Sequence, residues 1–90
     1  MTPADRFTVP ADVMARAVGT ETVLLDLASG TYFGLDEVGT RVWELLQEGK
    51  ALGDVCAAMA SEFEAPPDEI ESDVLELARN LLDRRLIQRA

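Results

Sequence analysis

The 90-residue sequence contains no histidine and only one cysteine, Cys56. Without histidine the chain lacks the side chain that most often acts as a general base near neutral pH, and it lacks one of the two usual zinc ligands. One cysteine cannot form an internal disulfide, which fits a reducing compartment. These absences argue against an enzyme, against a bound metal or other cofactor, and against a disulfide-stabilised secreted domain.

Basic residues and long apolar runs are also scarce. Eight Lys and Arg residues stand against 17 Asp and Glu, so the formal net charge is -9 at pH 7. A negative charge of this size repels phosphate backbones and anionic lipid headgroups, which disfavours nucleic acid and membranes as partners. No run approaches the roughly 20 apolar residues of a membrane span, and the N-terminus lacks a signal-peptide pattern. We therefore expect a cytoplasmic protein.

The composition is that of one small folded domain. Hydrophobic residues make up 48% and charged residues 28% of the chain, and a domain of the usual size needs roughly 100 residues. Because a chain this short buries only about 60 to 65% of its unfolded surface, we expect function on a surface groove rather than in a deep cavity. Residues 1–12 carry Pro3 and Pro10 without hydrophobic periodicity, which predicts a flexible or extended N-terminal arm before a single domain over residues 13–88.

The first third of the chain has the pattern of a small antiparallel sheet. Residues 13–18 and 22–27 are rich in aliphatic residues and are separated by the turn signal Gly19-Thr20. A second turn over residues 28–30 precedes the β-branched and aromatic residues 31–35. The pattern predicts three strands in a meander.

Three helices are predicted after the strands. The first runs from Asp36, a capping residue, to about residue 48, and Gly49 is placed to end it in a left-handed conformation. Apolar spacing predicts a second helix over residues 52–64, and Pro67 suits the first turn of a third helix that ends near residue 84. The expected fold class is therefore α+β, a winged-helix-like arrangement of a three-stranded antiparallel sheet followed by three helices.

The third predicted helix has an unusually wide apolar arc. One side of the arc consists of Ile70, Val74, Leu77 and Leu81, and the other side consists of Leu75, Ala78 and Leu82. We expect one margin to pack on the core and the other to line a groove. The acidic residues of this helix lie early and the basic ones late, an arrangement that matching to the helix dipole explains.

Side chains that could be reactive or bind a metal ion are better explained by structural roles. Cys56 lies on the apolar stripe of the second helix, so a buried thiol is favoured over a reactive one. The acidic residues between Glu62 and Glu76 lack calcium-loop spacing, and a solvated helix face is favoured over a cation site. A winged-helix DNA-binding regulator is the alternative that the topology suggests, but the second helix has no Lys or Arg and carries several carboxylates.

Peptide recognition fits the remaining observations. An edge strand over residues 31–35 would offer unpaired main-chain groups to an extended peptide, and a groove beside the third helix would select its side chains. Phe33 and Leu35 share one strand face and are equally explained as core residues. Tyr32, on the opposite face, is the better candidate for a contact.

The central segment resembles PqqD-like proteins. The motif LLD at residues 24–26 is followed by GTYFGLDEVGTRVWELL at residues 30–46, and the family pattern is an aliphatic strand, then Gly-x-Tyr-x-x-Leu-Asn, a helix-opening Gly and an Ile/Val-Trp pair. Asp36 stands where Asn is frequent, which preserves the capping chemistry. The resemblance extends over about residues 7–88 and ends in the leucine-rich LLDRRLI at residues 81–87.

This resemblance implies a noncatalytic recognition element for ribosomally made, post-translationally modified peptides. Such domains bind the leader of a precursor peptide as a strand antiparallel to their third strand and present it to a modifying enzyme, such as a leader peptidase or a radical enzyme. The lasso peptide pathway is favoured and pyrroloquinoline quinone (PQQ) synthesis comes second. A monomer is expected, although a free edge strand also permits dimerisation by strand pairing.

The resemblance also implies where the peptide would bind. Arg79 and Arg85 would meet acidic leader residues, although dipole matching explains these arginines too. The implied contacts lie on the third strand and on the third helix, and they are Thr31, Tyr32, Phe33, Gly34, Leu35, Leu75, Ala78, Arg79, Leu82 and Arg85.

Overall fold

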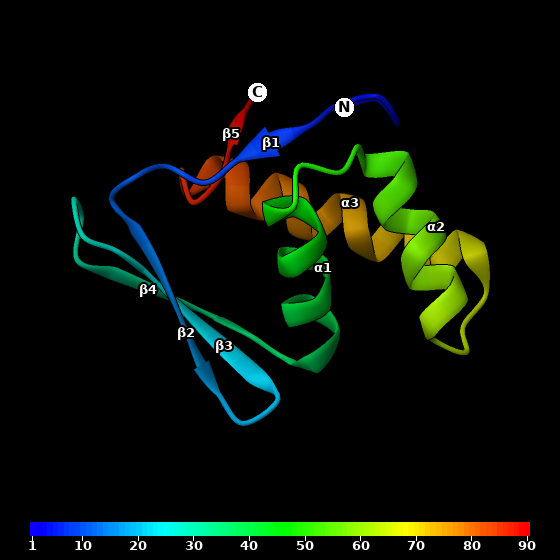
Figure 1. Ribbon diagram of the computed structural model, residues 1–90, viewed down its shortest axis with the longest axis horizontal. Coiled ribbons are helices and arrows are strands. Elements are labelled where there is room, and N and C mark those ends of the chain that lie inside the picture. Colours follow the sequence, from blue (N-terminus) through cyan, green and yellow to red (C-terminus); the bar gives the residue numbers. More distant parts are fainter.

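The computed structural model describes residues 1–90 and confirms the α+β class. A three-stranded sheet precedes three helices, and two further strands of two residues each join the chain ends. In Figure 1 the sheet lies to one side of α1 and α2 lies to the other, while α3 runs behind α1. The elements are β1 (Phe7–Thr8), β2 (Val13–Val18), β3 (Glu21–Asp26), β4 (Thr31–Leu35), α1 (Glu37–Gln47), α2 (Leu52–Glu62), α3 (Pro67–Asp83) and β5 (Gln88–Arg89).

The sheet is an antiparallel meander in the order β2-β3-β4. Val13 pairs with Asp26 across β2 and β3, and Asp26 pairs with Thr31 across β3 and β4. Gly19 and Gly30 occupy the two turns with φ of 65° and 73°, a left-handed conformation that residues with a Cβ rarely adopt. Because β3 is central, one edge of β4 has no partner strand.

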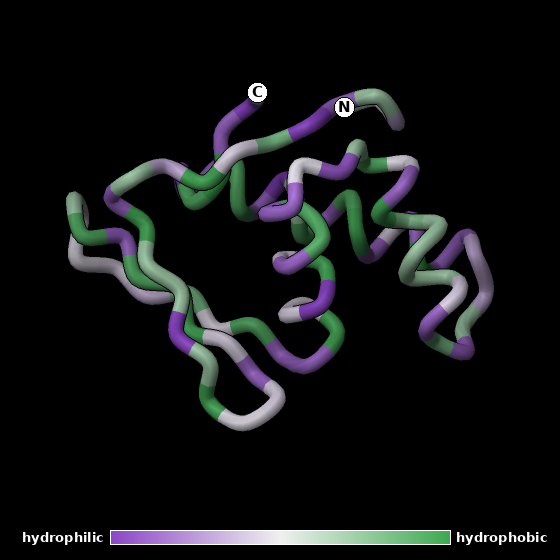
Figure 2. The backbone as a smooth tube through the Cα atoms, viewed as in Figure 1, coloured by the Kyte–Doolittle hydropathy of each residue, from purple (hydrophilic) through white to green (hydrophobic).

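The hydrophobic core lies between the sheet and the helices. Figure 2 shows apolar residues recurring along the helices between polar ones, as expected for helices with one buried face. The sheet contributes Leu24 and Leu35, and all three helices contribute to the same cluster. Trp43 of α1 is only 2% exposed. Its burial follows from the central position of α1, which contacts β1, β3, β4 and α2.

The helix ends follow local chemistry closely. The Asp36 side chain accepts a hydrogen bond of 2.7 Å from the Gly39 amide, as its capping role predicts. Gly49 ends α1 with φ of 84°, which confirms the predicted left-handed residue. Arg85 takes the equivalent position after α3 with φ of 58°, although it has a side chain.

None of the helices is long and apolar enough to span a membrane.

Residues 1–12 differ from the flexible arm that was expected. Phe7 is only 2% exposed within the core, and β1 pairs with β5 at the other end of the chain. The carbonyls of Pro3 and Asp5 accept hydrogen bonds of 2.9 Å from the amides of Gly53 and Leu52. Since α2 has no side-chain cap, these carbonyls satisfy the free amides of its first turn. The N-terminal segment is therefore part of the folded domain.

Candidate functional site

A groove with a volume of about 690 Å³ lies between β4 and α3. Ten of its 17 lining residues are hydrophobic, so its floor is largely apolar. The floor and walls come from β4, the first half of α1, the end of α2, the α2–α3 loop and one side of α3: Phe33, Gly34, Leu35, Asp36, Val38, Gly39, Val42, Met59, Phe63, Glu64, Ala65, Ile70, Asp73, Val74, Glu76, Leu77 and Asn80.

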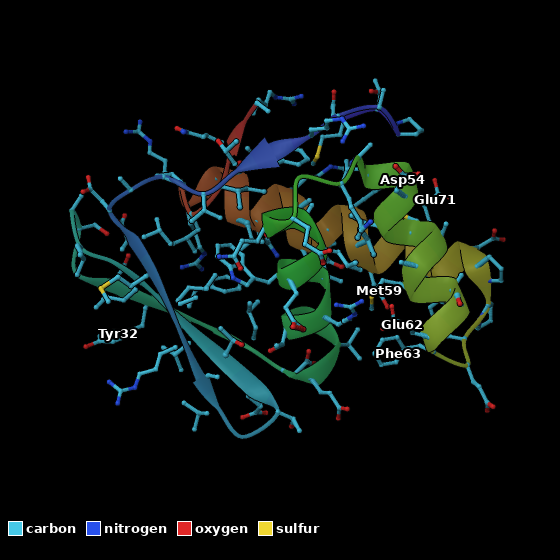
Figure 3. The ribbon with its side chains drawn as sticks, in the orientation of Figure 1. Tyr32, Asp54, Met59, Glu62, Phe63 and Glu71 are labelled. Atoms are coloured by element: carbon cyan, nitrogen blue, oxygen red, sulfur yellow. The ribbon has the colours of Figure 1, made fainter.

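The unpaired edge of β4 borders this groove. β4 hydrogen-bonds only with β3, and no other main-chain hydrogen bond involves residues 31–35. Leu35 is buried and Phe33 is half-buried, while Tyr32 is 70% exposed and projects away from the helices (Figure 3). The edge therefore offers unpaired amides and carbonyls directly beside an apolar surface, which is the arrangement that strand addition needs.

Arg84 lies over the middle residue of β4, at the margin of the groove. Its guanidinium carbon lies 5.0 Å from the centre of the Phe33 ring, within the range of a cation–π contact. Because Arg84 is the C-cap residue of α3, this contact joins the end of the helix to the strand. The contact also places a positive charge at this margin of the groove.

Carboxylates surround the other part of the groove. Asp36, Glu64, Asp73 and Glu76 line it, all four residues are exposed, and none of them forms an ion pair. No Lys or Arg is among the lining residues. The groove therefore combines an apolar floor with an acidic border.

An ion pair supports the wall that α2 contributes. Arg41 of α1 donates two hydrogen bonds to the Glu62 carboxylate, with N–O distances of 2.7 and 3.1 Å. The hydrogen bond from Arg41 lowers the pKa of Glu62 below its usual value, and the same bond raises the pKa of Arg41. The adjacent Phe63, together with Met59, lines the groove, so the pair holds this end of α2 in place (Figure 3).

Residues 21–87 match the family model described as Coenzyme PQQ synthesis protein D (PqqD). The chain belongs to the PqqD family. A PqqA binding protein of Xanthomonas campestris pv. campestris (strain B100) is 33% identical over 54 residues, which are 60% of this chain and 59% of that protein. A PqqA binding protein of Bradyrhizobium diazoefficiens is 26% identical over 87 residues, which are 97% of this chain and 84% of that protein.

Two solved structures share the PqqD fold of this chain. TbiB1 in complex with the TbiA(beta) leader peptide is 36% identical, with a TM-score of 0.84 and coverage of 90% of this chain and 94% of that one. A lasso peptide synthetase B1 complexed with the leader peptide is 24% identical, with a TM-score of 0.84 and coverage of 92% and 98%. At that lower identity the likeness shows the fold alone.

The predicted residues of the strand lie at the groove of this PqqD-family domain, but those of the helix do not. Phe33, Gly34 and Leu35 line the groove, while Thr31 and Tyr32 lie on the same edge strand. Leu75, Ala78, Arg79, Leu82 and Arg85 are absent from its lining.

The structure places the opposite margin of α3 beside the groove. Ala78 is 0% exposed in the core and offers a peptide no surface. Asp73, Leu77 and Asn80 form the groove wall instead. Leu75 and Leu77 are two residues apart, which is about 200° around a helix, so only one of them can face β4.

Several lining residues were not predicted as site residues. Met59 and Phe63 belong to the apolar residues whose spacing predicts the second helix, and Val38 lies at the start of the first predicted helix. No sequence signal separates these residues from core residues; Val38 stands out only in the structure, where it is apolar and 43% exposed.

Cys56 does not contribute to the groove. The thiol is half-buried, and burial followed by the negative charge of Glu71 raises its pKa. A raised pKa keeps the thiol protonated near neutral pH, which disfavours nucleophilic chemistry. No group of three or more Cys, Asp or Glu side chains is arranged to hold a metal ion.

Proposed function

We propose that this domain binds the leader segment of a ribosomally made precursor peptide as an added strand on β4. The observation that carries the proposal is the unpaired edge of β4 beside an apolar groove. Support comes from the PqqA binding proteins of the family and from the leader-bound TbiB1 structure, which is 36% identical to this chain. The leader would lie antiparallel to β4, with alternate side chains directed into the groove.

Main-chain and side-chain contacts would have separate roles. Hydrogen bonds to the strand edge attract any extended peptide, whereas the apolar floor selects the side chains that enter it. Micromolar binding corresponds to roughly -8 kcal/mol. A leader held with this affinity makes the encounter between the attached core peptide and a bound enzyme effectively intramolecular.

The domain would therefore act as a noncatalytic peptide chaperone for a modifying enzyme. We favour a lasso peptide pathway, in which the partner is a leader peptidase, as the first of the two pathways that the family resemblance implies. PQQ synthesis, with a radical enzyme as partner, is the second proposal. The DNA-binding alternative is not retained, because α2 carries Asp54 and Glu62 and no basic residue.

The test is an amide NMR titration of the labelled domain with leader peptides encoded near its gene. We expect shifts centred on β4 and on Asp73, Leu77 and Asn80 of α3. Shifts spread over α2 with duplex DNA and none with any leader would refute the proposal. The peptide that binds also identifies the pathway, since lasso and PQQ precursors differ in sequence.

A further inference from the structure

The charges around the groove are sorted along its length. Asp36, Glu64, Asp73 and Glu76 line it, and no basic residue does. A cation at its margin is Arg84, which lies over Phe33 in the middle of β4. None of these charged groups takes part in an ion pair within the chain, so their charges are available to a bound peptide.

The strand and the helix give this sorting a direction. β4 runs toward the start of α1. α3 passes behind α1 and runs in the opposite direction to β4 (Figure 1). Arg84, at the end of α3, contacts Phe33, whereas Asp73 and Ile70 line the groove together with Val38, beyond the end of β4. A positive charge therefore lies over the middle of β4, and the carboxylates lie around and beyond its last residue.

We infer that the groove selects a peptide whose basic side chain precedes its apolar anchor and whose acidic side chain follows it. The inference rests on the proposed function, in which the peptide runs antiparallel to β4. In that direction the N-terminal half of the peptide lies beside Leu35 and Asp36, among the carboxylates, and its C-terminal half lies beside Thr31 and Phe33, near Arg84. The apolar anchor between them enters the floor formed by Leu35, Val42 and Leu77.

Charge order contributes more to specificity than to affinity. Exposed ion pairs are individually weak, but a peptide with the reverse order brings its own carboxylates against four others. The repulsion is screened by salt, with a Debye length of about 10 Å at 0.1 M. The discrimination between the two orders should therefore be large at low salt and nearly absent at high salt.

Two synthetic peptides of identical composition test the inference. One has the sequence KKTVFTVSEE and the other, EETVFTVSKK, exchanges its charged ends. We expect the first peptide to bind about tenfold more tightly than the second in dilute buffer and about equally in concentrated salt, measured by fluorescence anisotropy. Amide shifts at β4 locate the bound peptide.

Matched charge reversals on α3 provide the control. Asp73→Lys reverses a charge in the groove, and Glu71→Lys reverses one on the same helix that is exposed but does not line the groove. The discrimination should be lost in Asp73→Lys and retained in Glu71→Lys.

The outcomes separate this inference from the proposed function. Equal binding of the two peptides at low salt, with shifts at β4, would overturn the charge order and leave strand addition intact. Equal effects of the two reversals would also overturn it, because the net charge alone would then explain the preference. Absence of shifts at β4 with both peptides would overturn the charge order, and the titration with native leaders then tests strand addition by itself.

Discussion

At the scale of residues, alanine substitutions of Leu75 and Leu77 separate the effect of core packing from the effect of leader binding. Both are half-buried leucines on α3, but only Leu77 lines the groove. Leu77→Ala removes apolar contact with a leader side chain, and the expected loss of about 1 to 2 kcal/mol corresponds to roughly 5- to 30-fold weaker leader binding. Leu75→Ala should change leader affinity by less than about twofold, because Leu75 does not line the groove and would make no contact with the leader.

The two variants are compared by anisotropy for leader affinity and by urea denaturation for stability. Both should lose some stability, since both leucines pack against the core. Equal losses of leader affinity would place the peptide somewhere other than the β4–α3 groove.

The left-handed backbone of Arg85 predicts that a substitution at this position changes the stability of the domain. Its φ of 58° is left-handed, and the amides of Arg85 and Leu86 donate to the carbonyls of Leu82 and Leu81, a Schellman ending that usually uses glycine. Arg85→Gly relieves the Cβ strain and should raise the free energy of unfolding by about 0.5 to 1 kcal/mol. Arg85→Ala removes the same charge without relieving the strain and should give no gain in urea denaturation.

The same variants test the recognition role that the family resemblance implied for Arg85. If Arg85 served the leader, Gly and Ala would both weaken leader binding. From its position outside the groove we expect neither to do so.

At the scale of elements, the N-terminal segment stabilises α2 through main-chain groups. Deletion of residues 1–5 removes the carbonyls of Pro3 and Asp5 that accept from the first turn of α2. The expected cost is about 1 to 2 kcal/mol of unfolding free energy, comparable to the loss of a helix cap. Hydrogen exchange at the amides of Leu52 and Gly53 should accelerate more than exchange in the β2–β3–β4 sheet.

Asp5→Ala is the control for this deletion. It keeps the Asp5 carbonyl and removes only the side chain, which forms an exposed ion pair with Arg89. We expect slow exchange at Leu52 and Gly53 to persist in this variant. Exchange as fast as in the deletion would assign the effect to the side chain instead.

At the scale of the whole molecule, the Arg41–Glu62 pair makes stability depend on acidity. The folded-state pKa of Glu62 lies below its usual value of 4.5, mainly because Arg41 donates to the carboxylate. A lowered pKa stabilises the folded protein above about pH 4.5, and this contribution is lost as the pH falls through the folded-state pKa. Glu62→Gln should therefore be less stable than the parent near neutral pH, with the difference vanishing in acid.

Urea midpoints measured from pH 7 down to about pH 3 check this expectation. Glu64→Gln makes the same change in charge two residues away, where no ion pair exists, and should follow the parent at every pH. A difference between the parent and Glu62→Gln that persists unchanged in acid would show that the pair contributes nothing through its charge.

The sequence by itself determined the three-stranded sheet, the three helices and the outer strand of the site. Gly19 and Gly30 marked the turns, and Asp36 and Gly49 marked the two ends of α1, because turns and caps depend on residues close together in the chain. The edge position of β4 also followed from the order of short hairpins. The sequence pattern that resembles PqqD-like proteins lies in this same local part of the chain.

Tertiary structure decided which margin of α3 faces the groove and how the N-terminal segment packs. The apolar arc is nearly symmetric about Val74 and Ala78, so periodicity cannot distinguish Leu75 from Leu77. Only the placement of β4 and α2 around α3 makes that choice. Phe7 likewise becomes a core residue through its pairing with β5 at the far end of the chain, a contact between segments that local sequence patterns do not encode.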